Sequence, residues 1–186
     1  MTSAKALSFE KAVWDVEAVE DTSRSKLVLE LYDREHLPLR RYLIWLGVDP
    51  STAEETVQES FLRLHQHLLS RGDRSNLRAW LYRVAHNFAR NVQSSSRASK
   101  TTYLADLSPE IDPRVTSDSA EQDLLVREQE RRLRSAMAEL SVAQRNCLVL
   151  RSQGLKYREI SEALDLSIST VAENIARGLG NLKEKL

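Results

Sequence analysis

The sequence contains a single cysteine, Cys147, among 186 residues. One cysteine cannot form an internal disulfide or a cysteine-based zinc site, so the reducing cytoplasm is the expected setting. No segment approaches the roughly 20 apolar residues of a membrane-spanning helix, and residues 1–9 lack a basic start followed by an apolar run. We therefore expect a cytoplasmic protein with no membrane insertion.

Glycine and proline are also scarce, with 5 Gly and 4 Pro in the whole chain. Hydrophobic residues make up 41% and charged residues 29% of the sequence, which is enough apolar material for a folded core. The commonest residues favour helices over strands. Together these features predict an all-α protein.

The net charge of zero hides an alternation along the chain. Residues 1–23 carry a net charge of −3, residues 24–96 of +3, residues 97–123 of −3 and residues 124–186 of +3. The segment 97–123 combines two prolines with many Ser, Thr and Asp residues and has no apolar period, as a flexible linker would. The sequence thus predicts an acidic N-terminal extension (1–23), which is either a short amphipathic helix or a disordered tail, and two small helical domains (24–96 and 124–186).

Helical spacing and capping residues place three helices in the first domain. A break or kink is expected near Pro38. Residues 49–51 (Asp-Pro-Ser) should start a second helix, with the proline in its first turn and Ser51 forming a capping box with Glu54. A third helix should run from about residue 76 to 92. The apolar positions expected to be buried are Ala53, Val57, Phe61, Leu64 and Leu68 in the second helix and Leu77, Leu81, Val84, Phe88 and Val92 in the third.

The second domain has the pattern of a helix-turn-helix. Ser141 and Gln144 form another capping box at the start of a helix. This helix runs from residue 142 to 153 and ends at Gly154, a good left-handed cap. A short helix over residues 157–164 is then joined by a three-residue turn to a last helix that begins after Ser167. This geometry is typical of DNA-binding domains, although many helical hairpins share it.

Two blocks of sequence resemble one known family. Residues 53–64 (AEETVQESFLRL) and 77–87 (LRAWLYRVAHN) resemble region 2 of the extracytoplasmic-function sigma factors of bacterial RNA polymerase. Residues 140–141 (LS), 144–145 (QR), 148–151 (LVLR), 154–160 (GLKYREI) and 166–171 (LSISTV) resemble region 4 of the same family. The match covers about residues 24–96 and 124–186 in the family's order, which is more specific than either motif alone.

The resemblance implies an alternative sigma factor, a promoter-recognition subunit without catalytic activity. Its partners would be core RNA polymerase, promoter DNA and a possible anti-sigma factor, with no cofactor. Region 2 would dock on the polymerase clamp and open the minus-ten element, and region 4 would bind the minus-thirty-five element. The implied polymerase-binding residues are Glu55, Gln58, Glu59 and Leu62. A plain solvated helix face is the alternative for these residues.

The implied DNA contacts lie on two helices. For the minus-ten element they are Arg83, Asn87, Arg90 and Asn91, with a polar loop over residues 94–99 beside them. Asn suits base edges and Arg suits phosphates, and the alternative here is a solvated helix end. The aromatic residues Trp80 and Tyr82 are candidates for stacking on single-stranded bases, although Trp80 borders the apolar stripe.

The implied minus-thirty-five contacts are Ser169, Thr170, Glu173, Asn174 and Arg177. Family members usually carry Lys or Arg at several positions of this helix, whereas this sequence has Ala172, Asn174 and Leu179 there. A second interpretation therefore stays open, a sigma-like regulatory protein that binds polymerase or another partner without reading promoters itself.

Metal and enzyme chemistry have little support in the sequence. His65 and His67 are two residues apart on a predicted helix, so their side chains diverge and cannot share a metal ion. The sequence has no phosphate-binding loop and no nucleophile elbow. Cys147 lies between apolar neighbours and is expected to be a buried structural thiol. We expect neither a metal site nor an enzyme.

Overall fold

The computed structural model describes residues 3–96 and 120–186, with side chains for residues 22–91, 124 and 126–186. Within these residues it has seven α-helices and no strand, so the predicted all-α class is confirmed. Most of the predicted linker lies outside the described residues, as does the side chain of Val92.

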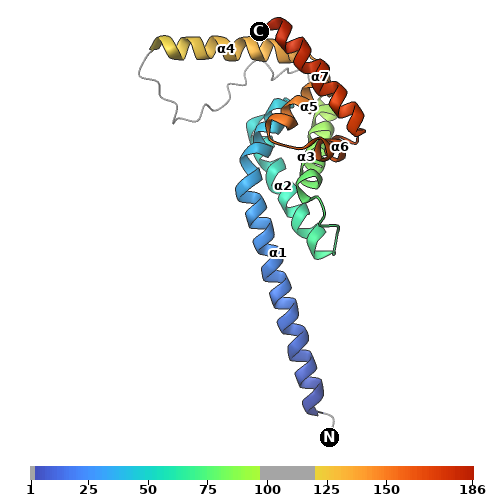
Figure 1. Cartoon of the computed structure of the whole chain (residues 1–186). Helices are drawn as coiled ribbons and strands as arrows, with labels where there is room; N and C mark the ends of the chain where they lie inside the picture. Colours follow the sequence, from blue (N-terminus) through green and yellow to red (C-terminus); the bar gives the residue numbers. More distant parts are fainter. Residues whose placement is uncertain (1–2, 97–119) are drawn as a thin grey trace.

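The first three helices form one packed unit. They are α1 (Ser3–Trp45), α2 (Pro50–Leu69) and α3 (Leu77–Ser96). The C-terminal part of α1 packs against α2 and α3, and its N-terminal part projects beyond them (Figure 1). Residues 3–23 of the predicted extension thus belong to the same helix as the residues that follow.

Of the break or kink expected near Pro38, the break is absent, because α1 continues through this residue. Proline lacks the backbone N–H that would bind one turn back, which normally weakens a helix. Leu39, Tyr42 and Leu43 directly after it are fully buried. The packing of these side chains is sufficient to keep the helix continuous across the missing hydrogen bond.

Helix α2 starts within the predicted segment 49–51, but its capping residue differs from the prediction. Asp49, not Ser51, caps the helix, and its carboxylate accepts a hydrogen bond of 3.0 Å from the backbone N–H of Thr52. The hydrogen bonds to Thr52 hold the pKa of Asp49 below its usual value. Pro50 then occupies the first turn, where its missing N–H costs nothing. Glu54, expected to complete a capping box, instead pairs with Arg40 of α1 at 3.3 Å.

The core face of α3 is wider than its sequence period predicts. Leu77 and Leu81 are buried as expected, whereas Val84 and Phe88 are half-buried. Further buried residues on α3 are Ala79, Tyr82, Ala85, His86 and Ala89. The reason is that α3 contacts α1, α2 and α6, so more than one side is covered. Because Tyr82 is fully buried, its suggested role in stacking on bases is wrong.

The remaining helices form the helix-turn-helix unit. They are α4 (Ala120–Ala138), α5 (Val142–Ser152), α6 (Tyr157–Leu164) and α7 (Ile168–Lys185). The capping box of Ser141 and Gln144 is present, Gly154 has the left-handed φ of +83°, and Ser167 caps α7. These local predictions are confirmed.

One glycine of α7 has a packing role that its sequence position does not reveal. Gly178 is buried where α7 crosses α5. A Cβ atom at this position would lie 2.8 Å from Cδ1 of Leu148. Glycine lowers the stability of a helix interior, but here it allows the two helices to approach closely.

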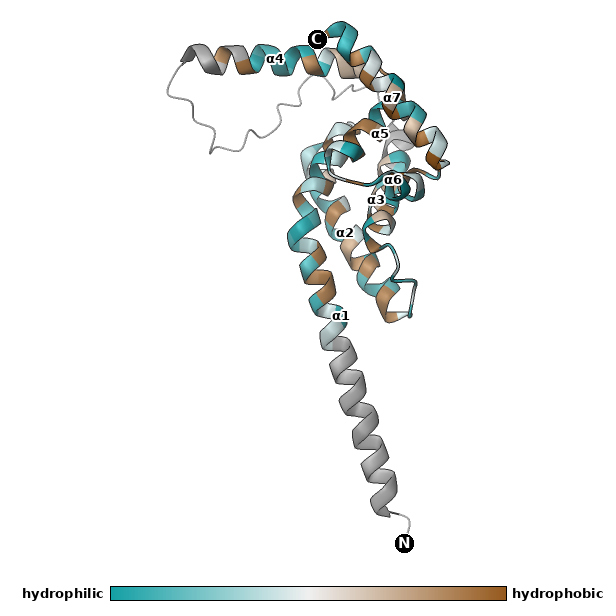
Figure 2. Cartoon of the chain, in the orientation of Figure 1, coloured by the Kyte–Doolittle hydropathy of each residue, from teal (hydrophilic) through white to brown (hydrophobic). Residues whose placement is uncertain are grey.

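The two units lie against each other. Helix α6 packs on α3 and α5 touches α1, and buried residues of both units form one hydrophobic cluster. Helix α4 contacts α7 and points away from the first three helices (Figure 1). Brown and teal residues interleave along α2, as expected for a helix with one buried face (Figure 2). The described part of the chain contains no helix that is both long and apolar enough to cross a membrane.

Candidate functional site

The outer face of α2 brings together the four residues implied in polymerase binding. Their spacing of three, one and three places them on one side of the helix. Glu55, Gln58 and Leu62 are exposed and Glu59 is half-buried. Leu62 is 61% exposed, so it adds apolar area to this face. The face therefore combines an apolar residue with acidic and amide groups.

The charge of this face is partly balanced within the helix. The guanidinium of Arg63 donates a hydrogen bond of 2.8 Å to the carboxylate of Glu59, one turn away. The same guanidinium lies 4.3 Å from the ring centre of Phe88 on α3. The carboxylate of Glu59 is therefore already paired, and Arg63 is positioned by contacts to both helices.

The outer face of α3 carries the residues implied in minus-ten binding. Arg83, Asn87, Arg90 and Asn91 are all exposed. Helix α3 continues to Ser96, so residues 94–96 are helical and not part of a loop. The face has two cations and two side-chain amides, a combination suited to phosphates and base edges.

A buried polar pair lies behind the outer face of α3. The imidazole of His86 is 2.7 Å from the hydroxyl of Tyr42 on α1. Burial, and secondarily the charge of Arg90, lower the pKa of His86 to about 4. His86 is therefore neutral near pH 7. A satisfied hydrogen bond in a buried position fixes the orientation of α3 relative to α1.

A second buried group was missed from the sequence, namely the carboxylate of Glu35 on α1. It is 3% exposed and pairs with Arg78 of α3 at 2.9 Å. Tyr82 donates a hydrogen bond of 3.4 Å to it. The available signal was the spacing of Leu31, Glu35 and Leu39, because a residue four positions from each of two buried leucines lies on the buried side of a helix.

The polar side chains on the exposed side of α7 bind groups of the same helix or of its capping residue. Glu173 and Arg177 form an ion pair at 2.6 Å. The side-chain amide of Asn174 donates to the backbone carbonyl of Thr170 at 2.9 Å. Ser169 and Thr170 each share a hydroxyl contact with the capping residue Ser167. Ser169, Glu173 and Arg177 are exposed, whereas Thr170 and Asn174 are half-buried. The five implied contacts thus carry no net charge.

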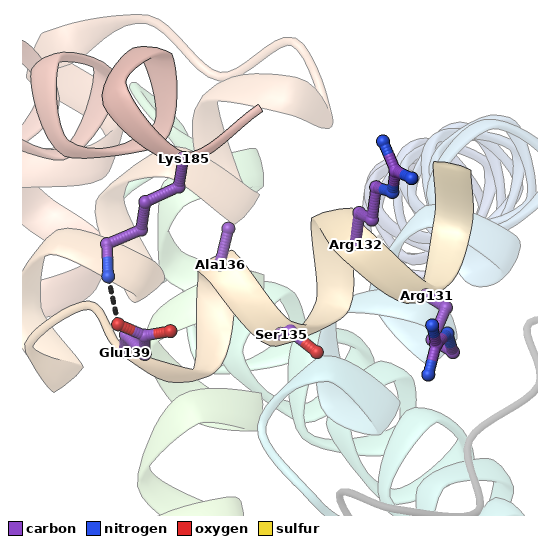
Figure 3. Close-up of a pocket in the computed structure, with 6 residues that line it drawn as sticks. All are labelled: Arg131, Arg132, Ser135, Ala136, Glu139 and Lys185. Carbon is purple, nitrogen blue, oxygen red and sulfur yellow. Dashed lines mark hydrogen bonds and ion pairs between the residues drawn. The ribbon is translucent and has the colours of Figure 1, made fainter. Parts of the chain in front are cut away.

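A shallow groove of about 230 Å³ lies between α4 and the end of α7. Its lining residues are Arg131, Arg132, Ser135, Ala136, Glu139 and Lys185 (Figure 3). Lys185 pairs with Glu139, and both arginines bind Glu128. Because acidic partners balance these cations, the groove is a poor anion site. Among the described residues there is no group of His, Cys, Asp or Glu side chains that could hold a metal ion.

Comparison with known proteins gives two family matches in this chain. Residues 31–98 match Sigma-70 region 2, and residues 130–182 match Sigma-70, region 4. The RNA polymerase sigma factor SigZ of Bacillus subtilis is 31% identical over 160 residues, which cover 84% of this chain and 85% of SigZ.

Solved structures share the fold at lower sequence identity. The structure of CnrH in complex with the cytosolic domain of CnrY has a TM-score of 0.61 and 21% identity, and covers 90% of this chain and 92% of CnrH. The sigma factor RpoE in complex with the anti-sigma factor NepR from Bartonella quintana has a TM-score of 0.60 and 23% identity, and covers 86% and 95%. With both family regions present in order, the chain belongs to the extracytoplasmic-function sigma factors of RNA polymerase.

Proposed function

We propose that this alternative sigma factor binds its partners through three helix faces. The outer face of α2 binds core RNA polymerase, the outer face of α3 binds the minus-ten element, and α7 binds the minus-thirty-five element. The supporting observation is that the residues implied by the family gather on one side of α2 and of α3, where all but the half-buried Glu59 are exposed. The proposed units are an extension (1–23), region 2 (24–96), a linker (97–123) and region 4 (124–186).

The α2 face suits a partner with basic and apolar groups. Glu55 offers an exposed carboxylate, and Leu62 two turns away offers apolar area that is lost from water on docking. Complementary charges mainly steer association, while the apolar contact adds affinity.

The α3 face suits a DNA strand whose bases have left the helical stack. Asn87 and Asn91 are one turn apart and present amides that can donate to and accept from a base edge. Arg83 and Arg90 lie next to them on the same exposed face and suit the phosphates. The buried hydrogen bond of His86 to Tyr42 holds this face in place.

The assignment of α7 to the minus-thirty-five element has the least support of the three. The one cation among the five implied contacts, Arg177, is paired with Glu173, so few counterions would be released on binding. This observation favours the second candidate function, a sigma-like protein that binds polymerase or another partner without reading promoters. An anti-sigma factor is a further proposed partner, because RpoE of similar fold is found with one.

We propose no catalytic activity for the chain and place its action in the cytoplasm, where RNA polymerase meets the chromosome. Transcription from promoter DNA by core polymerase plus this chain separates the two candidate functions. Initiation at defined start sites supports the sigma factor. Stable binding to core polymerase without initiation supports the rival.

The docking assignment is tested by replacing Glu55 and Glu59 with arginine together. Placing like charges at a contact costs several kcal/mol, so affinity for core polymerase should fall at least tenfold. The control double variant replaces Glu30 and Asp33 of α1, which are exposed acids outside the proposed face. If both double variants are folded and bind core polymerase equally well, the assignment of the α2 face is wrong.

A further inference from the structure

One cation of α2 lies between the faces proposed to bind polymerase and the minus-ten element. Among the 20 residues of α2, all of which the structure describes, Arg63 is the only arginine or lysine. A cation that faced outward here would repel the basic partner proposed for Glu55 and Glu59, because like charges at a contact are unfavourable. The guanidinium of Arg63 is instead held toward α3.

Contacts to both helices hold this guanidinium. Its Nε donates a hydrogen bond of 2.8 Å to Oε1 of Glu59, and its central carbon lies 4.3 Å from the ring centre of Phe88 on α3. The two helices lie side by side (Figure 1). A guanidinium stacked on an aromatic face keeps the N–H donors at its edge available for an anion. Arg63 therefore has donors to offer beyond its bond to Glu59.

The ring of Phe88 places Arg63 at the edge of the minus-ten face. Asn91 follows Phe88 by three positions and Asn87 by four, so it is a neighbour of both on the surface of α3. Phe88 is half-buried on the side of α3 that meets α2, whereas the two asparagines are exposed. The face already carries two exposed arginines of α3. The guanidinium of Arg63 adds a third cation from the side of α2.

We propose that Arg63 is a further phosphate-binding residue of the minus-ten site, contributed by α2. This inference rests on the function proposed for the α3 face. The guanidinium donates to a backbone phosphate of the promoter strand while its flat side stays on the ring of Phe88. Because phosphate contacts carry no sequence information, Arg63 adds affinity and orientation, and the asparagines of α3 contact the bases.

Glu59 connects this phosphate contact with polymerase docking. In the chain alone its carboxylate holds Arg63, and the two side chains are 44% and 51% exposed. An exposed ion pair is weak because water competes for both groups, so its partners exchange readily. A basic group of polymerase takes the carboxylate of Glu59 while a DNA phosphate takes the guanidinium of Arg63. Each charge keeps a partner, and by linkage each ligand favours binding of the other.

The first experiment measures binding of single-stranded DNA to the full chain without polymerase. The probe is a short fluorescent thymidine oligonucleotide, since phosphate contacts do not depend on sequence. Glu59→Gln keeps the side-chain shape and releases Arg63, so affinity at low salt should rise about threefold. The slope of log affinity against log salt should steepen by about 0.7, as expected for one added phosphate contact to a single strand.

Glu30→Gln is the matched control for this measurement. Glu30 pairs with Lys26 of α1, four positions away, and both side chains are exposed. The change also removes one negative charge and releases one cation, but outside the α3 face, so its gain in affinity should be smaller. Adding Arg63→Met to Glu59→Gln should abolish the gain. Equal gains for Glu59→Gln and Glu30→Gln, or a gain that survives Arg63→Met, would overturn the proposal.

The second experiment uses holoenzyme at a start site mapped with the parent chain. Arg63→Met should keep or raise the affinity for core polymerase, because it removes a competitor for Glu59. It should lower the permanganate reactivity of the opened promoter at least threefold, or about the effect of one phosphate contact. Arg63→Lys retains the charge and should restore part of the opening. If opening is the same with Arg63→Met and the parent, or if core binding and opening fall in equal proportion, Arg63 does not act on DNA.

A third variant separates this inference from the function on which it rests. Arg83→Met removes a cation of the α3 face itself and should weaken binding of the same oligonucleotide. If Arg83→Met weakens binding and Glu59→Gln behaves like Glu30→Gln, only the role of Arg63 is wrong. If neither arginine affects DNA binding, the assignment of the α3 face is wrong as well.

Discussion

Removal of the cation beside Glu35 should strongly destabilise the first unit. Glu35 is 3% exposed, and its carboxylate pairs with Arg78 at 2.9 Å. Arg78→Met keeps much of the side-chain volume but leaves a buried charge without its main partner, a loss that costs about 3–5 kcal/mol in comparable sites. Arg34 lies 3.5 Å from the same carboxylate but is 70% exposed. Because solvent screens its charge, Arg34 should restore only a small part of the lost stabilisation of Glu35. We expect Arg78→Met to lower the free energy of unfolding by about 3 kcal/mol.

Urea unfolding followed by circular dichroism measures this loss in the full chain. The matched control is Arg83→Met, an exposed arginine of the same helix, which should change the free energy of unfolding by less than about 0.5 kcal/mol. The double variant Glu35→Leu with Arg78→Met removes both charges, and should be more stable than Arg78→Met alone.

Two results would refute this reasoning. If Arg78→Met unfolds at the same urea concentration as Arg83→Met, the stability of the fold does not depend on pairing the buried carboxylate of Glu35 with Arg78. If the double variant is as unstable as the sum of its two single changes, the two groups are not coupled and the loss arises from packing alone.

Two further predictions concern pH and helix packing. The pKa of His86 is about 4 in the folded chain against 6.5 for a free histidine, so the unfolded chain binds the extra proton between these values. His86 should therefore lower the free energy of unfolding by about 3 kcal/mol as pH falls from 6.5 to 4, and urea titrations should show a flatter pH dependence in His86→Gln. Gly180→Ala should raise the free energy of unfolding by up to about 1 kcal/mol, because a Cβ there meets nothing within 4 Å. Gly178→Ala should bring no such gain because its Cβ would meet Leu148 at 2.8 Å; equal melting shifts for the two alanines would contradict the packing role of Gly178.

Local signals in the sequence were sufficient for most helix boundaries of the second unit. The capping box of Ser141, the left-handed Gly154 and the cap at Ser167 each depend on groups within a few residues of one another. The start of α2 was less determined, because Asp49 and Ser51 on either side of Pro50 are both good capping residues. Only the observed hydrogen bond of Asp49 to Thr52 distinguishes them.

Helical spacing also predicted which residues share a face. Glu55, Gln58, Glu59 and Leu62 lie together on α2, as do the implied contacts on α3, because positions three and four apart are neighbours on any helix. Spacing did not predict how these groups are bound. The ion pairs of Glu59 with Arg63 and of Glu173 with Arg177 depend on side-chain rotamers, and in each pair the carboxylate is bound by a cation of its own helix.

The sequence by itself determined the helical class, the family motifs and the local caps, since these depend on neighbours along the chain. The tertiary structure alone decided which polar groups are buried and how the units meet. Tyr42 and His86 are 44 positions apart, and Arg78 and Gly154 are 76 apart. The spacing of apolar residues along one helix shows that the helix has a buried side. It does not show how many other helices cover that side, or which polar group a distant helix brings to a buried carboxylate.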